Sequence, residues 1–181
     1  MQLVQNKYYH LYNRSNNKEV VFKESRNYPY FLRKYGKYLS SFVNTICYCL
    51  MPTHFHFLIK IISDDSDLLR KNIGILLSSY TKAINKVNNR NGSLFQNHTK
   101  AKVIENDEYM WNLINYIHQN PLRKGLVENI DEWEFSSYRD IAGFRKGSLI
   151  DKNFYKTKFT SEKEFILFSS SKTEKIDYLF S

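Results

Sequence analysis

Residues 45–62 read TICYCLMPTHFHFLIKII and contain two runs rich in β-branched and aromatic residues, separated by a short break at Pro52. Such a break between two β-rich runs is typical of an antiparallel hairpin. Because side chains alternate between the two faces of a strand, His54 and His56 would share one face, and Phe55 would lie on the other. The stretch therefore predicts a hairpin with two imidazoles side by side on one face.

Outside the hairpin, strand patterns and helix patterns follow one another along the chain. We expect strands at residues 8–14 and 100–105 and helices at residues 28–42, 68–87 and 107–120. Pro121 and Gly125 would follow the end of the third helix. This order predicts an α+β fold, with an antiparallel sheet and helices packed on one face of it. The last forty residues are less regular, with a possible helical piece at 154–168.

The chain of 181 residues is strongly basic. Lys and Arg number 27 against 18 Asp and Glu, which gives a formal net charge of +9 and a pI near 9.4. An excess of this size favours a polyanionic partner, of which nucleic acid is the commonest, although basic chains can also simply be soluble. The 14 Tyr and 13 Phe residues would suit stacking against unpaired bases.

Neither a membrane nor an oxidising compartment is indicated by the sequence. No apolar stretch approaches membrane-spanning length, and residues 1–10 lack the apolar core of a signal peptide. Cys47 and Cys49 would point the same way along one strand, and we interpret them as small hydrophobic residues. We therefore expect a cytoplasmic, nucleoid-associated protein with no membrane partner.

Two pairs of residues could carry chemistry. Two neutral imidazoles at His54 and His56 can hold one divalent metal ion and leave positions open for a phosphate oxygen. On the third helix, Tyr116 and Asn120 are one turn apart and share a face. The Asn carbonyl oxygen could be a metal ligand and the phenol a nucleophile, but a buried tyrosine beside a helix-terminal asparagine would give the same pattern.

Several motifs in a fixed order provide the context for these residues. The chain contains L-M-P-T-H-F-H at residues 50–56 and Y-I-H-Q-N-P-L-R-K-G-L-V at residues 116–127. It also contains G-S-L-F-Q at residues 92–96, W-E-F-S-S-Y at residues 133–138, and Tyr12-Asn13-Arg14 at the end of the first strand. Together these motifs resemble those of the REP-associated tyrosine transposases, a group of single-tyrosine HUH transposases, over roughly residues 8–141.

The resemblance implies a ferredoxin-like fold and a role for each matching residue. His54 and His56 would bind Mg²⁺ or Mn²⁺, with Asn120 as the third protein ligand. Tyr116 would attack DNA and form a 5′-phosphotyrosine link that can be rejoined to another end. The partner would be single-stranded or hairpin DNA with palindromic repeats, bound by a monomer or a homodimer. The transposase domain would span residues 1–144, and residues 145–181 would form a C-terminal extension.

Contacts with the DNA backbone are expected from basic side chains. The positions that we predict are Arg14, Lys82, Lys86, Arg90, Lys100, Lys102, Arg123 and Lys124. Each of them could equally be solvated surface. His98 is more consistent with a surface residue than with a ligand, and His118 would point away from the face of Tyr116. Glu105 and Asp107 are weaker candidates for metal ligands than for a solvated helix start.

Two other functions fit the same residues. A hairpin-binding protein for DNA or RNA could keep the fold without catalysis, and its binding would survive removal of the metal. A hydrolytic metallonuclease would use water as its nucleophile, so its cleavage would persist without the phenol of Tyr116. The complete set of transferase residues favours the transferase.

Overall fold

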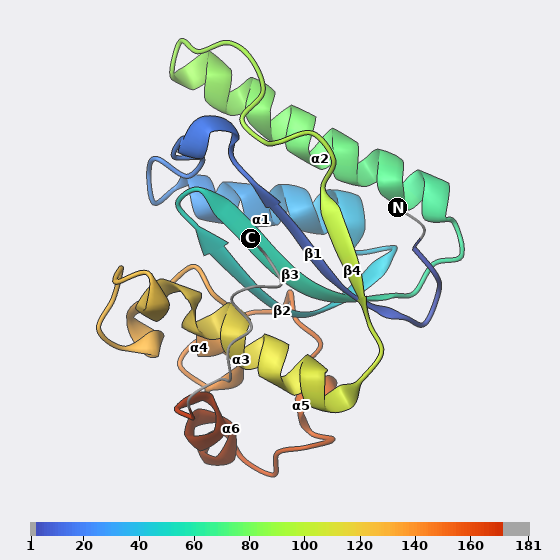
Figure 1. Ribbon diagram of the computed structural model, residues 1–181, viewed down its shortest axis with the longest axis vertical. Coiled ribbons are helices and arrows are strands. Elements are labelled where there is room, and N and C mark those ends of the chain that lie inside the picture. The colour runs from blue at the N-terminus through green and yellow to red at the C-terminus, as the bar shows by residue number, and fades with distance from the viewer. Residues whose placement is uncertain (1–2, 172–181) are drawn as a thin grey trace.

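The computed structural model describes residues 3–171, which form an α+β fold around a four-stranded antiparallel sheet (Figure 1). The strands lie in the order β2 (Val43–Met51), β3 (His54–Ile61), β1 (Tyr8–Arg14) and β4 (Lys100–Ile104). Helix α1 (Asn27–Leu39) connects β1 to β2, and helix α2 (Ser66–Val87) connects β3 to β4. This is the ferredoxin-like arrangement, so the predicted fold class is confirmed.

The predicted hairpin is formed by β2 and β3. Its strands pair in antiparallel register up to Met51 and His54, on either side of the turn. On β1, Tyr12 lies opposite His56, and His10 lies two residues before it on the same face. We call the side of the sheet that carries His10, His54 and His56 the imidazole face.

Helices α1 and α2 cover the other face of the sheet with aromatic side chains. Tyr35 of α1 stacks on Phe57 with ring centroids 4.2 Å apart, and Phe31 contacts Phe55 at 5.3 Å. Tyr80 of α2 packs edge-on against Phe31 at 5.1 Å. None of these five side chains is more than 2% exposed. Burial of each such ring stabilises the fold by about 1.5–3 kcal/mol.

Helix α3 (Asp107–Arg123) lies against the imidazole face. Its Tyr116 packs edge-on against His56, with ring centroids 6.1 Å apart. The expectation that the helices share one face therefore holds for α1 and α2 but not for α3. The physical reason is that β2 also places apolar side chains, Cys47 and Cys49, on the imidazole face, and these reach full burial only if that face is covered as well.

Helix α3 continues beyond the predicted end at residue 120 and includes Pro121. It ends at Arg123, and Gly125, two residues further on, has a φ of 65°. The N–H of Gly125 donates to the carbonyl of Leu122, and the N–H of Leu126 donates to the carbonyl of Pro121, as in a Schellman motif. Pro121 removes one hydrogen bond from the helix but does not end it. The additional residues of the helix include Arg123, which lines the pocket described in the next subsection.

The chain after α3 packs against that helix and against the outer edge of β2. Its short helices are η2 (Ile130–Glu132), α4 (Tyr138–Ile141), α5 (Lys152–Tyr155) and α6 (Glu162–Ser169). The helical piece predicted at 154–168 is therefore two helices. The domain boundary at residue 144 stays a prediction, and residues 172–181 of the predicted extension lie outside the described residues. No helix within residues 3–171 has the length and apolar character needed to cross a membrane.

An ion pair between the buried Asp140 and the half-buried Arg145 ties the segment after α4 to β2. Asp140 is 3% exposed and accepts two hydrogen bonds of 2.7 Å from Arg145, which also donates to the Tyr48 hydroxyl of β2. We expect Asp140→Ala to lower the free energy of unfolding by about 2 kcal/mol, because it removes charge-assisted hydrogen bonds to a guanidinium that is 35% exposed. Urea denaturation would measure this, with the exposed Asp64→Ala as control. A loss equal to that of the control would contradict the prediction.

Candidate active site between the sheet and helix α3

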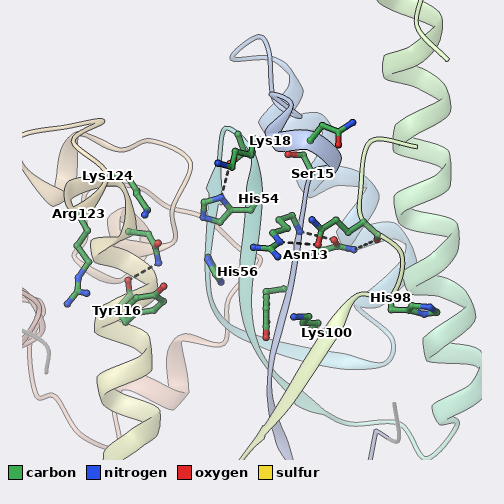
Figure 2. Close-up of a pocket in the computed structure, with 16 residues that line it drawn as sticks. Asn13, Ser15, Lys18, His54, His56, His98, Lys100, Tyr116, Arg123 and Lys124 are labelled. Atoms are coloured by element: carbon green, nitrogen blue, oxygen red, sulfur yellow. Dashed lines mark hydrogen bonds between the residues drawn. The ribbon is translucent and has the colours of Figure 1, made fainter. Parts of the chain in front are cut away.

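A pocket of about 920 Å³ lies between the imidazole face and helix α3. Figure 2 shows Tyr116 on the helix facing the strands that carry His54 and His56. The predicted site residues that line this pocket are Tyr116, His54, His56, Asn120, Arg14, Lys100, Arg123 and Lys124. The tertiary structure thus brings all four residues predicted for catalysis and metal binding into one place.

Both histidines of the hairpin are held through the same ring atom. The Nδ1 of His54 is 3.0 Å from the hydroxyl of Thr53 in the turn. The Nδ1 of His56 is 2.9 Å from the Nε2 of His10 on β1. It is therefore through Nε2 that each ring could bind a metal ion, and the two rings lie edge-to-face with centroids 5.1 Å apart.

The histidines are neutral at physiological pH. Burial, together with the nearby charges of Lys124 and Arg14, lowers the pKa of His54 to about 4. Burial also lowers the pKa of His56 well below its usual value, with smaller effects from His10 and His54. Burial lowers the pKa of His10 to about 3. Because metal ions bind neutral imidazole, these rings are in the form that a metal site requires.

Asn120 and Tyr116 reach the pocket from one face of α3. Asn120 is 3% exposed, and its Nδ2 donates to the carbonyl of Tyr116 at 3.1 Å. This bond fixes which end of the carboxamide faces the helix, and it leaves Oδ1 as the atom that could act as a ligand. The guanidinium of Arg123 lies over the ring of Tyr116, 5.4 Å from its centroid, in a cation–π contact.

The donor set fits one divalent metal ion of the predicted kind. Two imidazole nitrogens and one amide oxygen suit a small cation that keeps positions open for substrate oxygens. Among residues 3–171, no group of three His, Cys, Asp or Glu side chains could hold a metal, and the predicted third ligand is the amide oxygen of Asn120. Glu105 and Asp107 do not line the pocket, in agreement with a solvated helix start.

Comparisons with known proteins lead to the same group as the motifs. A protein of Haemophilus influenzae named as a REP-associated tyrosine transposase is 26% identical over 107 residues, which cover 54% of this chain and 60% of that protein. A solved structure of a REP-associated tyrosine transposase bound to a REP hairpin superposes with a TM-score of 0.63 at 18% identity, over 83% of this chain and 91% of that one. The predicted resemblance to REP-associated tyrosine transposases is confirmed. No family model matches the chain.

The basic residues predicted to contact DNA divide into two groups. Figure 2 shows Arg123 and Lys124 on the helix side of the pocket and Lys100 on the strand side. The predicted positions that do not line the pocket are Lys82, Lys86, Arg90 and Lys102. Lys82 and Lys86 are exposed on α2, which covers the opposite face of the sheet. Arg90 is bound to Glu19 with an N–O distance of 2.6 Å, which gives it a structural contact.

The sequence did not predict four further residues that line the pocket or contact a lining residue. Lys18, at the end of the short helix η1 (Asn16–Lys18), and Gln96 both line the pocket. His98, which we interpreted as a surface residue, is exposed but lies on the pocket rim with a φ of 65°. His10 supports His56 from behind. The sequence contained a signal for His10, because strand alternation places His10 and Tyr12 on the same face of the first strand.

The pocket contains a second phenol, that of Tyr12. Its ring stacks on His10 with centroids 4.7 Å apart, and the ammonium of Lys100 lies 6.0 Å from its centroid. Any assignment of the nucleophile must therefore distinguish Tyr116 from Tyr12. His118, in contrast, is fully buried and bonded to Ser137 at 2.8 Å, outside the pocket as expected.

Proposed function

We propose that this protein is a metal-dependent, single-tyrosine transposase that cleaves and rejoins single-stranded or hairpin DNA. The observation that carries the proposal is the convergence of Tyr116, His54, His56 and Asn120 on one basic pocket. The similar solved structure, a REP-associated tyrosine transposase bound to a REP hairpin, supports hairpin DNA as the partner. Such an activity would bring the protein to the nucleoid.

The proposed reaction exchanges one phosphodiester bond for another. The phenol oxygen of Tyr116 forms a bond to the scissile phosphorus and loses its proton, and the bond from phosphorus to the 3′ oxygen breaks. The leaving 3′ oxygen takes up a proton, and the DNA end stays linked as a 5′-phosphotyrosine. Attack by another 3′-OH reverses these steps, so rejoining needs no ATP.

Each side chain has a separate task in this scheme. His54, His56 and Asn120 would hold a Mg²⁺ or Mn²⁺ ion, which polarises the scissile phosphate and neutralises developing charge when it is bound. Arg123 lies over the ring of Tyr116 and helps to hold the ring in the pocket by a cation–π contact. The α3 helix presents Tyr116 in a fixed orientation, because the ring is only 8% exposed.

Covalent trapping tests the proposal. Hairpin-bearing single-stranded oligonucleotides, taken from palindromes near the gene and labelled on the 3′ side of the nick, would be incubated with the protein and Mn²⁺ or EDTA. We expect a protease-sensitive labelled band on a denaturing gel only with Mn²⁺. Digestion and mass spectrometry should locate the DNA on Tyr116 and not on Tyr12. An adduct on Tyr12 would overturn the assignment of the nucleophile.

The two rival functions give different results in this assay. Cleavage without an adduct would indicate a hydrolytic metallonuclease, in which the same histidines activate water. Binding without cleavage, unaffected by EDTA, would indicate a hairpin-binding protein without catalysis. Either result, obtained across the whole set of oligonucleotides, would contradict the transferase.

The position of the basic residues predicts which of them contact DNA. We expect Lys100→Ala to weaken binding of single-stranded DNA and to reduce the slope of log K against log salt concentration by about 0.7, as for the loss of one phosphate contact. Lys86→Ala, on the exposed face of α2, is the matched control and should leave the slope unchanged. Fluorescence anisotropy titrations between low and physiological salt would measure both. Equal effects of the two substitutions would contradict a path of the DNA through the pocket.

A further inference from the structure

A third histidine, His10, lies directly behind His56. On the central strand β1 it is two residues from Tyr12, the residue opposite His56, so the two imidazoles are diagonal neighbours on one face. The Nε2 of His10 is 2.9 Å from the Nδ1 of His56. His10 is fully buried and does not line the pocket, so it can influence DNA or metal there only through neighbours that do line it, such as His56 and Tyr12.

The hydrogen bond between the two rings has a direction once His56 binds a metal. A neutral imidazole carries its proton on one nitrogen and a lone pair on the other. If the Nε2 of His56 gives its lone pair to a metal, the proton must be on Nδ1. That N–H then donates to the Nε2 of His10, which accepts. The contact thus matches the only neutral tautomer of His56 that can be a ligand through Nε2.

We propose that His10 is a positioning residue of the metal site, which accepts the Nδ1–H of His56 and holds its Nε2 towards the pocket. The inference rests on the proposed metal-dependent function and adds a residue to it. Supporting groups of this kind, which bond the second nitrogen of a histidine ligand, orient the ring and strengthen its binding to the metal.

Ring stacking adds a second restraint on His56. Its ring is stacked with that of His10 at 5.1 Å and with that of Tyr12 at 6.0 Å. The plane of the imidazole is therefore held by contacts as well as by the hydrogen bond. His54 has a weaker arrangement, because the hydroxyl of Thr53 can either donate or accept and so selects no tautomer.

The chemistry of the site gives a reason for an imidazole at this position. A carboxylate would orient His56 equally well, but it would add a negative charge behind a pocket that is proposed to receive phosphate and to form a phenolate. A neutral imidazole orients the ligand without that charge. Lys102, which lies opposite His10 in the register of β1 and β4, is also more compatible with a neutral ring than with a second cation.

The test is the affinity of the DNA-free protein for Mn²⁺, measured by electron paramagnetic resonance titration. His10→Phe keeps a ring of similar size but removes the acceptor, and we expect it to weaken Mn²⁺ binding about 10–100-fold. His10→Gln supplies an amide oxygen that can accept from His56, and it should restore part of the affinity. Cleavage by the Phe variant should recover when Mn²⁺ is raised to saturation.

His118→Phe is the matched control. His118 is also fully buried and also bonded through Nε2, to the Ser137 hydroxyl at 2.8 Å, but it lies outside the pocket. The same substitution there removes the same kind of hydrogen bond from the interior. We expect it to affect thermal stability and to leave Mn²⁺ affinity unchanged. An equal loss of affinity in both variants would overturn a specific role for His10.

Two further outcomes separate this inference from the function on which it rests. If the wild type binds Mn²⁺ and His10→Phe binds it equally well, the inference is overturned and the metal site stands. If the wild type binds no Mn²⁺, the proposed metal dependence fails and the inference fails with it. Nitrogen-15 NMR of the wild-type imidazoles with Mg²⁺ needs no variant: a proton on Nδ1 of His56 supports the proposal, and one on Nε2 overturns it.

Discussion

Tyr116→Phe is expected to reduce formation of the covalent protein–DNA adduct at least about 10³-fold, to the limit of detection, because it removes the attacking oxygen. Hairpin binding should stay within about twofold of the wild type, since the aromatic ring and its contact with His56 are retained. The measurement is the amount of labelled adduct on a denaturing gel, with binding followed separately in EDTA.

Tyr12→Phe is the matched control for this substitution. Tyr12 lines the same pocket and carries the only other phenol among its lining residues. We expect the Tyr12 variant to form adduct at a rate close to that of the wild type. Persistence of the adduct in Tyr116→Phe, together with its loss in Tyr12→Phe, would assign the nucleophile to β1 and contradict the family motif.

The second large effect is expected at the histidine pair. His54→Ala should lower the rate of adduct formation about 10²–10³-fold at fixed Mn²⁺, as the loss of one group that stabilises developing charge does in other enzymes. His54 is only partly buried at the end of β3, so the variant should fold normally. Single-turnover cleavage across a range of Mn²⁺ concentrations would measure the effect.

His98→Ala is the control for His54→Ala. His98 lines the same pocket, but it is exposed at the rim. We expect cleavage by this variant to keep the wild-type dependence on Mn²⁺. A loss as large as that of His54→Ala would indicate that His98 belongs to the metal site, and an unchanged rate in His54→Ala would contradict the predicted ligands.

Much of the fold follows from local patterns in the sequence. The break at Pro52 between two β-rich runs is sufficient to predict the hairpin, and strand alternation is sufficient to place His54 and His56 on one face. The helical spacing of Tyr116 and Asn120 likewise places them on one face of α3. These features depend on neighbouring residues, so they can be read without knowing where the segments meet.

Local sequence patterns gave a wrong helix end where one pattern favoured ending the helix and another favoured continuing it. Pro121 predicts the end of a helix, but α3 continues to Arg123 because the helix is buried up to Pro121 and its exposed last residues are capped by a Schellman motif. The regular spacing of Lys82 and Lys86 predicts a basic stripe on α2, which is present. Its separation from the pocket depends on which face of the sheet α2 covers.

The sequence by itself determined the strand and helix pattern, the paired imidazoles and the motif order, because these are properties of adjacent residues. Only the tertiary structure decided that α3 crosses the imidazole face, that Lys100 and not Lys86 lines the pocket, and that His10 supports His56. Such contacts join segments distant in the chain. They depend on which strands pair and on which face of the sheet each helix covers, and no local pattern contains this information.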